Sequence, residues 1–287
     1  MKTCSGKPIL LVGNTFQQRN AAGERELVDA ETQANIEAII VNNPNIDIVA
    51  DDPIVAAQLA EYTSQLEKFS KEVIGQAAED LLHIRIPCTQ ELGVELPNGS
   101  HIATLVAEAF FQQLKSRNYN PDLVIQNAGG IRNSIFKGDI TIETVYTLLS
   151  FTNTIYLLEL TGAEVKQLLE DALSHHFDNG GSDGSFPYAA NIRYTIEINR
   201  QFMERVTSLE IKDDNGNWMP IDLNKIYRVG TCSFIAHGKD GFATFGKVLK
   251  ERGGIDTYFD YAESFVNYVK MVGTLIRPNI GITYIDE

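Results

Sequence analysis

The stretch Asp122-Leu-Val-Ile-Gln126 runs directly into Asn127-Ala-Gly-Gly-Ile-Arg132. A short apolar run that is closed by glycines is typical of a buried strand ending in a tight turn. Strand-like and helix-like patterns alternate on both sides of this stretch. We therefore expect a mixed α/β fold of the α+β class, with mixed sheets packed against helices and a helical linker in front.

The neighbouring segments predict the other elements of this fold. We expect helices over 31–42, 53–71 and 101–115, a short helix opening at Thr141, one behind the capping box Thr161-Gly-Ala-Glu164, and a last one capped by Asp260. We expect strands over 7–12, 154–160, 192–198, 209–211 and 227–231, a loop over 177–187 and a hairpin turn over 213–217.

The composition excludes several classes of protein. The 287 residues carry 24 Lys and Arg against 38 Asp and Glu, a formal net charge of −14, which argues against binding nucleic acid. The apolar run near the N-terminus is too short for a membrane span or a signal peptide. Three widely spaced cysteines and five scattered histidines form no metal-binding pattern, so we expect free thiols and no metal ligands in this chain.

Three loops carry candidate chemistry. In Asn127-Ala-Gly-Gly-Ile-Arg132, the glycines Gly129 and Gly130 would let a ligand approach the backbone, and Arg132 could hold a phosphate. Spacing alone favours an ordinary tight turn with a surface arginine. Phe151, in a polar connection, could stack on a base or fill the core.

The third loop holds Phe234 and the turn Asp240-Gly-Phe242. A carboxylate can accept hydrogen bonds from both hydroxyls of a ribose. However, an Asp-Gly pair is also a routine turn, so the residues leave both interpretations open.

Taken together and in this order, these segments resemble the C-terminal domain of the 5′-nucleotidase family. The resemblance covers nearly all of residues 85–285. It also rests on Gly138-Asp-Ile-Thr141, Leu160-Thr-Gly162 and Tyr227-Arg-Val, and the stretches Ile84-Arg-Ile-Pro87 and Leu96-Pro-Asn-Gly-Ser100 are similar to bacterial members that process NAD. The family's Gly-Gly-Asp-Gly loop is here Gly238-Lys-Asp-Gly241, and we expect Lys239 to point to solvent.

The resemblance implies a role for each matching residue. The base of a nucleoside or nucleotide would stack between Phe151 and Phe234, and Asp240 would bind its ribose. Arg132, with Arg85 as the second family arginine, would bind phosphate. Asn127 would supply an amide facing the base or the site.

Family enzymes also have an N-terminal metallophosphatase domain that holds two divalent metals. Its Gly-Asp-x-His and Gly-Asn-His motifs do not occur in this sequence. Residues 5–14 (Ser-Gly-Lys-Pro-Ile-Leu-Leu-Val-Gly-Asn) instead resemble the last strand region of that domain. The resemblance therefore implies that residues 1–28 are the end of such a domain, 29–80 a helical linker and 81–287 the nucleotide-binding domain. We expect no catalytic residue and no bound cofactor in this chain.

Three functions are compatible with this organisation. The chain is the substrate-binding part of a nucleotide phosphohydrolase, a stand-alone nucleotide-binding module, or an inactive truncated fragment. The family is mostly periplasmic or at the cell surface, but the chain has no signal segment from which its own location could be inferred.

Overall fold

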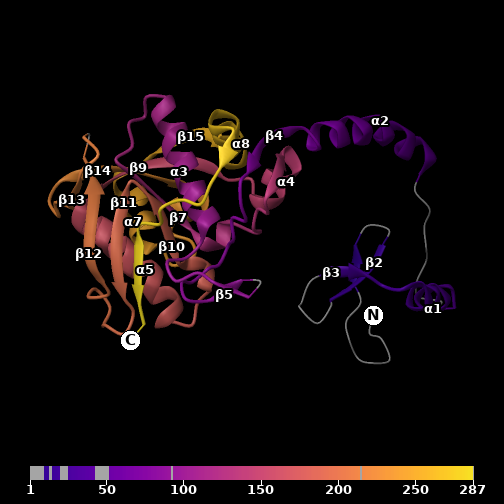
Figure 1. The fold of residues 1–287 in the computed structure, drawn as a ribbon, viewed down its shortest axis with the longest axis horizontal. Coiled ribbons are helices and arrows are strands. Elements are labelled where there is room, and N and C mark those ends of the chain that lie inside the picture. The colour runs from indigo at the N-terminus through magenta and orange to yellow at the C-terminus, as the bar shows by residue number, and fades with distance from the viewer. Residues whose placement is uncertain are drawn as a thin grey trace. The chain divides into compact units, whose positions relative to one another are not determined.

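The computed structural model describes residues 10–12, 15–19, 25–42, 52–91, 93–213 and 215–286. The chain divides into two compact units, Met1–Ser64 and Gln65–Glu287 (Figure 1). The predicted boundaries after residues 28 and 80 stay predictions.

The first unit contains a small antiparallel sheet and helices. Its strands are β1 (Leu10–Val12), β2 (Thr15–Arg19) and β3 (Arg25–Leu27), and they are followed by α1 (Ala30–Val41). The side chain of Asp29 caps α1 by accepting the backbone N–H of Thr32 at 2.6 Å. The predicted helix over 31–42 is thus confirmed. Part of the strand predicted over 7–12 is present as β1, whereas residues 7–9 lie outside the described residues.

The helix α2 (Pro53–Ser70) confirms the helix predicted over 53–71. Its apolar side chains, however, are largely exposed, for example Leu59, Tyr62 and Leu66. The helical period is therefore present without the buried face that usually accompanies it.

The second unit is built on a five-stranded mixed sheet in the order β10-β7-β14-β9-β15. The strands are β7 (Leu123–Asn127), β9 (Thr154–Thr161), β10 (Pro187–Ala190), β14 (Ile226–Cys232) and β15 (Ile255–Asp260). β7 and β14 pair in parallel, and the other neighbours pair antiparallel. All five residues of β7 are buried, as the apolar run at its start predicted.

Helices pack against this sheet. α3 (His101–Ser116) contacts β7, β10 and β14 as well as α8 (Tyr261–Val272), whereas α5 (Gly162–Phe177) contacts β9 and α7 (Ala243–Arg252). The short helices α4 (Ile142–Leu148) and α6 (Ser233–Ala236) follow β8 and β14. Sheet and helices share one large apolar core, so the α+β class is confirmed.

Three smaller sheets complete the unit. The first has the order β13-β12-β11-β17, with β11 (Ile192–Glu197), β12 (Val206–Lys212), β13 (Trp218–Pro220) and β17 (Ile282–Ile285). The second has the order β16-β4-β8, with β4 (Val73–Ala77), β8 (Gly138–Thr141) and β16 (Thr274–Leu275). The third pairs β5 (Gln90–Glu91) with β6 (Val94–Glu95).

The predicted helix starts carry the expected caps. Thr161 and Glu164 form a capping box at the start of α5. Asp260 caps α8 by accepting the backbone N–H of Glu263 at 2.8 Å. Within Asn98-Gly99-Ser100, it is Ser100 whose hydroxyl caps α3.

Two further expectations concern the thiol state of the cysteines and the presence of a membrane-spanning segment. Cys232 is buried and Cys88 is exposed, both as free thiols, and Cys4 lies outside the described residues. Burial raises the pKa of the Cys232 thiol to about 11. Among the described residues, no helix has the length and apolar character needed to span a bilayer.

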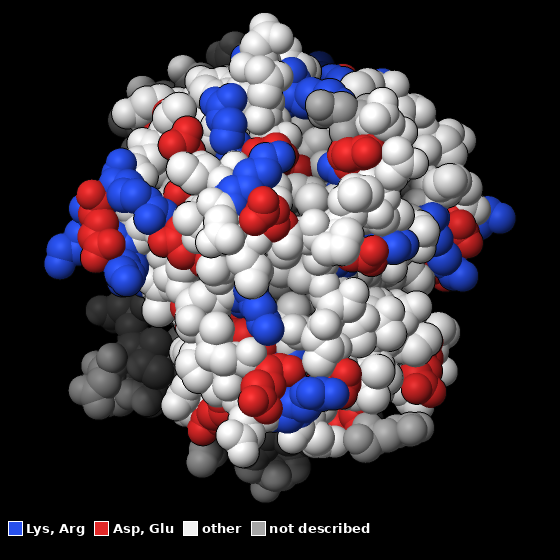
Figure 2. Space-filling model, turned by 90° about the vertical axis from the view of Figure 1, so that its left-hand side faces the viewer, with Lys and Arg blue, Asp and Glu red and all other residues white. Residues whose placement is uncertain are grey.

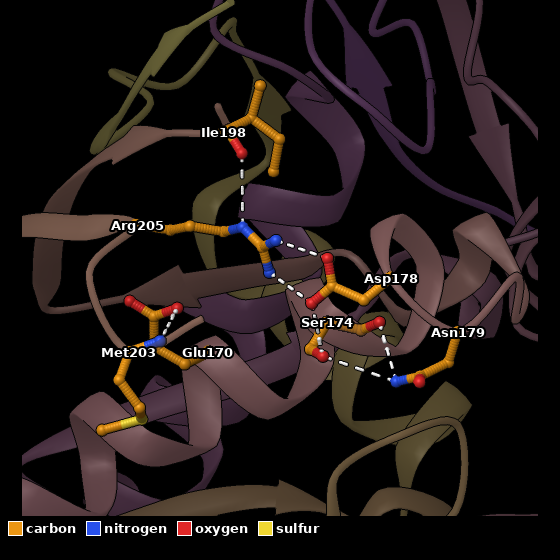
Figure 3. Close-up of polar contacts among 7 residues, drawn as sticks. All are labelled: Glu170, Ser174, Asp178, Asn179, Ile198, Met203 and Arg205. Carbon is orange, nitrogen blue, oxygen red and sulfur yellow. Dashed lines mark hydrogen bonds and ion pairs between the residues drawn. The ribbon is translucent and has the colours of Figure 1, made fainter. Parts of the chain in front are cut away.

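A polar network ties the end of α5 to the turn before β12. Glu170 is fully buried and accepts the backbone N–H groups of Met203 at 3.0 Å and Val206 at 2.7 Å. Ser174 lies one turn after Glu170 in α5, and Asp178, the C-cap of the helix, lies one turn after Ser174 (Figure 3). Because a buried carboxylate without partners is costly, these bonds hold the turn against the helix.

Arg205 completes this network. Its guanidinium is buried, donates to both carboxylate oxygens of Asp178 at 2.9 and 2.5 Å, and donates through Nε to the carbonyl of Ile198 at 3.3 Å (Figure 3). These bonds lower the pKa of Asp178 below its usual range.

Replacing Asp178 with Asn should remove the charge partner of a guanidinium whose side chain is only 6% exposed. We expect Asp178→Asn to lower the free energy of unfolding by about 2–4 kcal/mol. Urea unfolding followed by the fluorescence of Trp218, the single tryptophan, measures this loss. As a control, Glu197→Gln breaks the surface pair with Arg200 and should cost much less than Asp178→Asn, because water screens an exposed pair. Equal losses for the two variants would contradict this interpretation.

Candidate functional site

One cavity of about 240 Å³ collects the side chains that the sequence predicted to act together. Its lining consists of Arg85, Asn127, Gly129, Gly130, Arg132, Phe151, Asn153, Ser182, Phe234 and Asp240. All eight predicted site residues are among them. They come from four separate segments, which meet where β7 and β14 end and β9 begins. That they bind a ligand stays a prediction.

The two phenylalanines present apolar surface to the cavity. Phe151 lies in the connection between α4 and β9, and Phe234 lies in α6. Their exposed fractions are 49% and 45%. Neither ring fills the core, which was the alternative that the sequence left open for Phe151. A half-exposed aromatic ring in a cavity leaves a free π-face for a ligand.

Arg132 lies beside the first of these rings. Its guanidinium carbon is 5.7 Å from the centroid of the Phe151 ring, and Nη1 donates to the carbonyl of Gly129 at 3.2 Å. The ring and the carbonyl orient the guanidinium, and its other N–H donors make no further hydrogen bond among the described residues.

Asp240 and Asn127 meet at the wall of the cavity although they are 113 residues apart. The amide nitrogen of the buried Asn127 donates to Asp240 Oδ2 at 2.8 Å. Asp240 has a φ of 55°, in the left-handed region. A non-glycine residue held in that region is strained, and such strain is concentrated at functional sites.

The backbone around Asp240 is fixed by close packing. Gly241 has a φ of +82°, and a Cβ at this position would lie 2.3 Å from Cβ of His175 in α5. On the following helix, the backbone N–H of Thr244 donates to Asp171 Oδ2 at 3.0 Å. α5 therefore sets the position of the loop that carries the carboxylate.

The glycine turn is packed equally closely. Gly129 belongs to the 3₁₀ turn Ala128–Gly130, where a Cβ would lie only 3.1 Å from Cα of Gly184 in the turn Asp183–Ser185. The buried Tyr261 hydroxyl donates to the carbonyl of Gly130 at 2.9 Å. The turn is thus closely packed, and a side chain at position 129 would require the second loop to shift slightly.

Arg85 reaches the cavity from the segment before α3. Its Nη1 atom lies 2.6 Å from Oδ1 of Asp183. His83 lies nearby, and its buried Nε2 has no hydrogen-bond partner in the part of the chain that the structure describes. Burial, and next the positive charges of Arg85 and Arg132, lower the pKa of His83 to about 4, so the ring is neutral at pH 7.

Asn153 and Ser182 also line the cavity but were not predicted. The Ser233 hydroxyl donates to Oδ1 of Asn153 at 3.1 Å, and the Asn153 carbonyl accepts the N–H of Tyr261. Asn153 follows Phe151 by two residues in the same polar connection, and this proximity in the sequence could have identified it as a cavity residue. The loop over 177–187 was expected, but its sequence did not indicate which side chain faces a cavity.

The histidine pair at the end of α5 serves packing. His175 contacts Gly181 and Gly241, and Nδ1 of His176 lies 3.0 Å from the carbonyl of Gly181. In the part of the chain that the structure describes, no group of three or more His, Cys, Asp or Glu is placed to hold a metal ion. The metals implied by the family resemblance therefore have no fitting site among these residues.

The surface charge has no single dominant sign on the face drawn in Figure 2. Basic and acidic side chains are interspersed there, instead of forming one basic patch. This face therefore has no basic patch of the kind that a nucleic-acid interface needs.

The fold and the cavity define the class to which the molecule belongs. Residues 73–247 match the family described as 5′-nucleotidase, C-terminal domain. Because the match covers more than half of the chain, the chain belongs to this family, as its sequence motifs indicated.

Two relatives show how much of a longer protein the chain represents. It is 35% identical to a probable 5′-nucleotidase of Treponema pallidum, over 91% of this chain and 44% of that protein. It is also 35% identical to the NAD 5′-nucleotidase of Haemophilus influenzae, over 91% of this chain and 43% of that protein. The chain thus spans less than half the length of these relatives.

Solved structures agree with these matches. The chain is similar to the NAD nucleotidase of Haemophilus influenzae, with a TM-score of 0.71 and 32% identity over 96% of this chain and 48% of that one. It is also similar to a 5′-nucleotidase precursor from Thermus thermophilus, with a TM-score of 0.67 and 28% identity over 100% of this chain and 54% of that one.

Substituting Gly241 tests how the carboxylate loop is held. We expect Gly241→Ala to lower the free energy of unfolding by about 2–4 kcal/mol, because it adds a left-handed alanine and a clash with His175. Gly180→Ala is the matched control, since Gly180 also has a positive φ but has nothing within 4 Å of the added Cβ. It should cost only about 1 kcal/mol. Urea unfolding compares the two, and a similar loss in both would show that the contact with α5 is unimportant.

Proposed function

We propose that this chain is the substrate-binding part of a nucleotide phosphohydrolase of the 5′-nucleotidase type. The observation that carries the proposal is the convergence on one cavity of two half-exposed phenylalanines, two arginines and a carboxylate. Each belongs to a segment that resembles the family. The cavity thus offers one kind of contact for each part of a nucleotide.

In this proposal the base stacks between Phe151 and Phe234. Stacking is tolerant of sequence, because every base has a π-face, and contributes about 1–3 kcal/mol per base. The ribose hydroxyls bind Asp240, whose other contact, with the Asn127 amide, holds the carboxylate in place. The phosphate binds Arg132, and Arg85 lies on the same cavity.

The chain's own residues bind and orient the substrate, which lowers the entropic cost of the reaction. Phosphate release would need the two divalent metals of an N-terminal metallophosphatase domain, which would activate water and polarise the phosphate. That domain is the proposed partner. The relatives matched here are more than twice as long as the region they share with this chain.

A non-catalytic nucleoside- or nucleotide-binding module is the alternative. It would use the same cavity without the metals. The two proposals therefore agree on binding and differ on phosphate release.

Binding is tested on the purified chain by calorimetry and thermal unfolding with adenosine and AMP. A ligand at 100 times its Kd should stabilise the chain by about 2.7 kcal/mol. Phe151→Ala and Phe234→Ala should each weaken binding by about 1–3 kcal/mol, which is roughly 5- to 150-fold. Phe202→Ala is the matched control, because Phe202 is also 45% exposed but does not line the cavity. If the parent shows no ligand-induced shift, or both cavity variants bind like the parent, the proposal fails.

Phosphate release separates the enzyme from the module. We expect no release from AMP by this chain alone with Mg²⁺, Mn²⁺ or Zn²⁺, because the sequence has neither Gly-Asp-x-His nor Gly-Asn-His. Release should appear when the chain is fused behind the N-terminal part of the Haemophilus influenzae NAD 5′-nucleotidase. Phosphate release by the unfused chain would refute the proposal that catalysis requires the N-terminal domain. A correctly folded but inactive fusion would favour the non-catalytic binding module.

A further inference from the structure

The two arginines of the cavity are in different electrostatic situations. Arg85 is paired with Asp183 at 2.6 Å, and the side chains of the pair are 38% and 41% exposed. Arg132 is held by a backbone carbonyl and an aromatic ring, and it makes no ion pair among the described residues. Only one of the two guanidinium groups is therefore unopposed by a carboxylate.

Asp183 is held on a rigid support. It begins the short turn Asp183–Ser185, where the hydroxyl of Ser182 accepts the backbone N–H of Gly184 at 3.0 Å. The buried Ser185 hydroxyl donates to the carbonyl of Ala172 in α5 at 2.8 Å. Because Gly184 also packs on the glycine turn of the cavity, the backbone that carries Asp183 cannot shift without disturbing the cavity wall.

The charges around the cavity consequently balance. Arg85 and Arg132 are positive, Asp240 and Asp183 are negative, and His83 is neutral near pH 7. A ligand phosphate that binds Arg85 has to compete with a carboxylate that is already in contact with it. A doubly charged phosphate interacts more strongly with both guanidinium groups than a singly charged one, and the Asp183 carboxylate repels it more strongly. The loss of affinity caused by Asp183 therefore grows with the charge of the phosphate.

We propose that Asp183 is a specificity-determining residue that competes with the ligand's phosphate for Arg85. The proposal rests on the function proposed above. Asp183 lowers the preference of the cavity for a doubly charged terminal phosphate, relative to an uncharged nucleoside or a singly charged phosphodiester. It acts through Arg85 and takes no part in bond breaking.

The test compares adenosine with AMP in the variant Asp183→Asn. Calorimetry at low ionic strength should show AMP binding about two- to fivefold tighter than in the parent, because an exposed ion pair of this kind is weak. Adenosine binding should change less than twofold. The gain for AMP should shrink as salt is added, since salt screens the interaction.

The control variant is Glu197→Gln, which breaks the pair between Glu197 and Arg200. It changes the net charge by the same amount but lies outside the cavity lining. AMP affinity should therefore stay at the parent value. Equal tightening in both variants would assign the effect to net charge and overturn the proposal.

A double-mutant cycle with Arg85→Gln tests whether Asp183 acts through Arg85. In the Arg85→Gln background, Asp183→Asn should have no further effect on AMP binding. Tightening that persists without Arg85 would contradict the mechanism. Thermal unfolding of each variant, compared with the parent, confirms that the fold is intact.

The outcomes for the two proposals are distinguishable. If the parent binds neither adenosine nor AMP, the proposed function fails and the role of Asp183 fails with it. If the parent binds both but Asp183→Asn leaves AMP binding unchanged or weakens it, only the role of Asp183 is refuted. In the second case Asp183 would instead orient Arg85 for the phosphate.

Discussion

The C-terminal half of α5 is the constraint on which the candidate site depends. Its buried Glu170 binds the turn before β12, and Asp178 binds the buried Arg205 at the same turn. On other faces, Asp171 binds the start of α7, and His175 packs against Gly241. The helix therefore fixes both the sheet β13-β12-β11-β17 and the loop that carries Asp240. A shift of the helix would separate its carboxylates from their partners and would therefore be costly.

This rigidity explains how the cavity keeps an unfavourable local arrangement. Phe151 and Phe234 expose apolar surface, and Asp240 has a left-handed backbone. Each feature costs free energy, and packing around it has to offset that cost. The contact of two glycine-containing turns, through Gly129 and Gly184, and the hydroxyl of Tyr261 supply such packing. Strain and exposure at the cavity thus coexist with an otherwise well-packed core.

Local patterns predicted the elements with strong periodicity or caps. The capping box of Thr161 and Glu164, the cap at Asp260 and the buried strand β7 were all found as expected. The predictions omitted β4 and β15, since β4 contains Gly75 and β15 contains a bulge, and neither shows a clear alternation. α2 shows the opposite case: its apolar period is helical, yet the side chains are exposed, because period alone does not say what covers a face.

For the site, the sequence by itself predicted which side chains line the cavity and determined the family to which the chain belongs. Ordered motifs at 127–132, 151 and 234–242 were sufficient for that, since each lies in a short, recognisable segment. Only the tertiary structure decided that Asn127 meets Asp240 and that Arg85 meets Asp183, across 113 and 98 residues of chain. Such contacts depend on strand order and on how α5 holds its loops. These are properties of the whole packed domain, which no local spacing encodes.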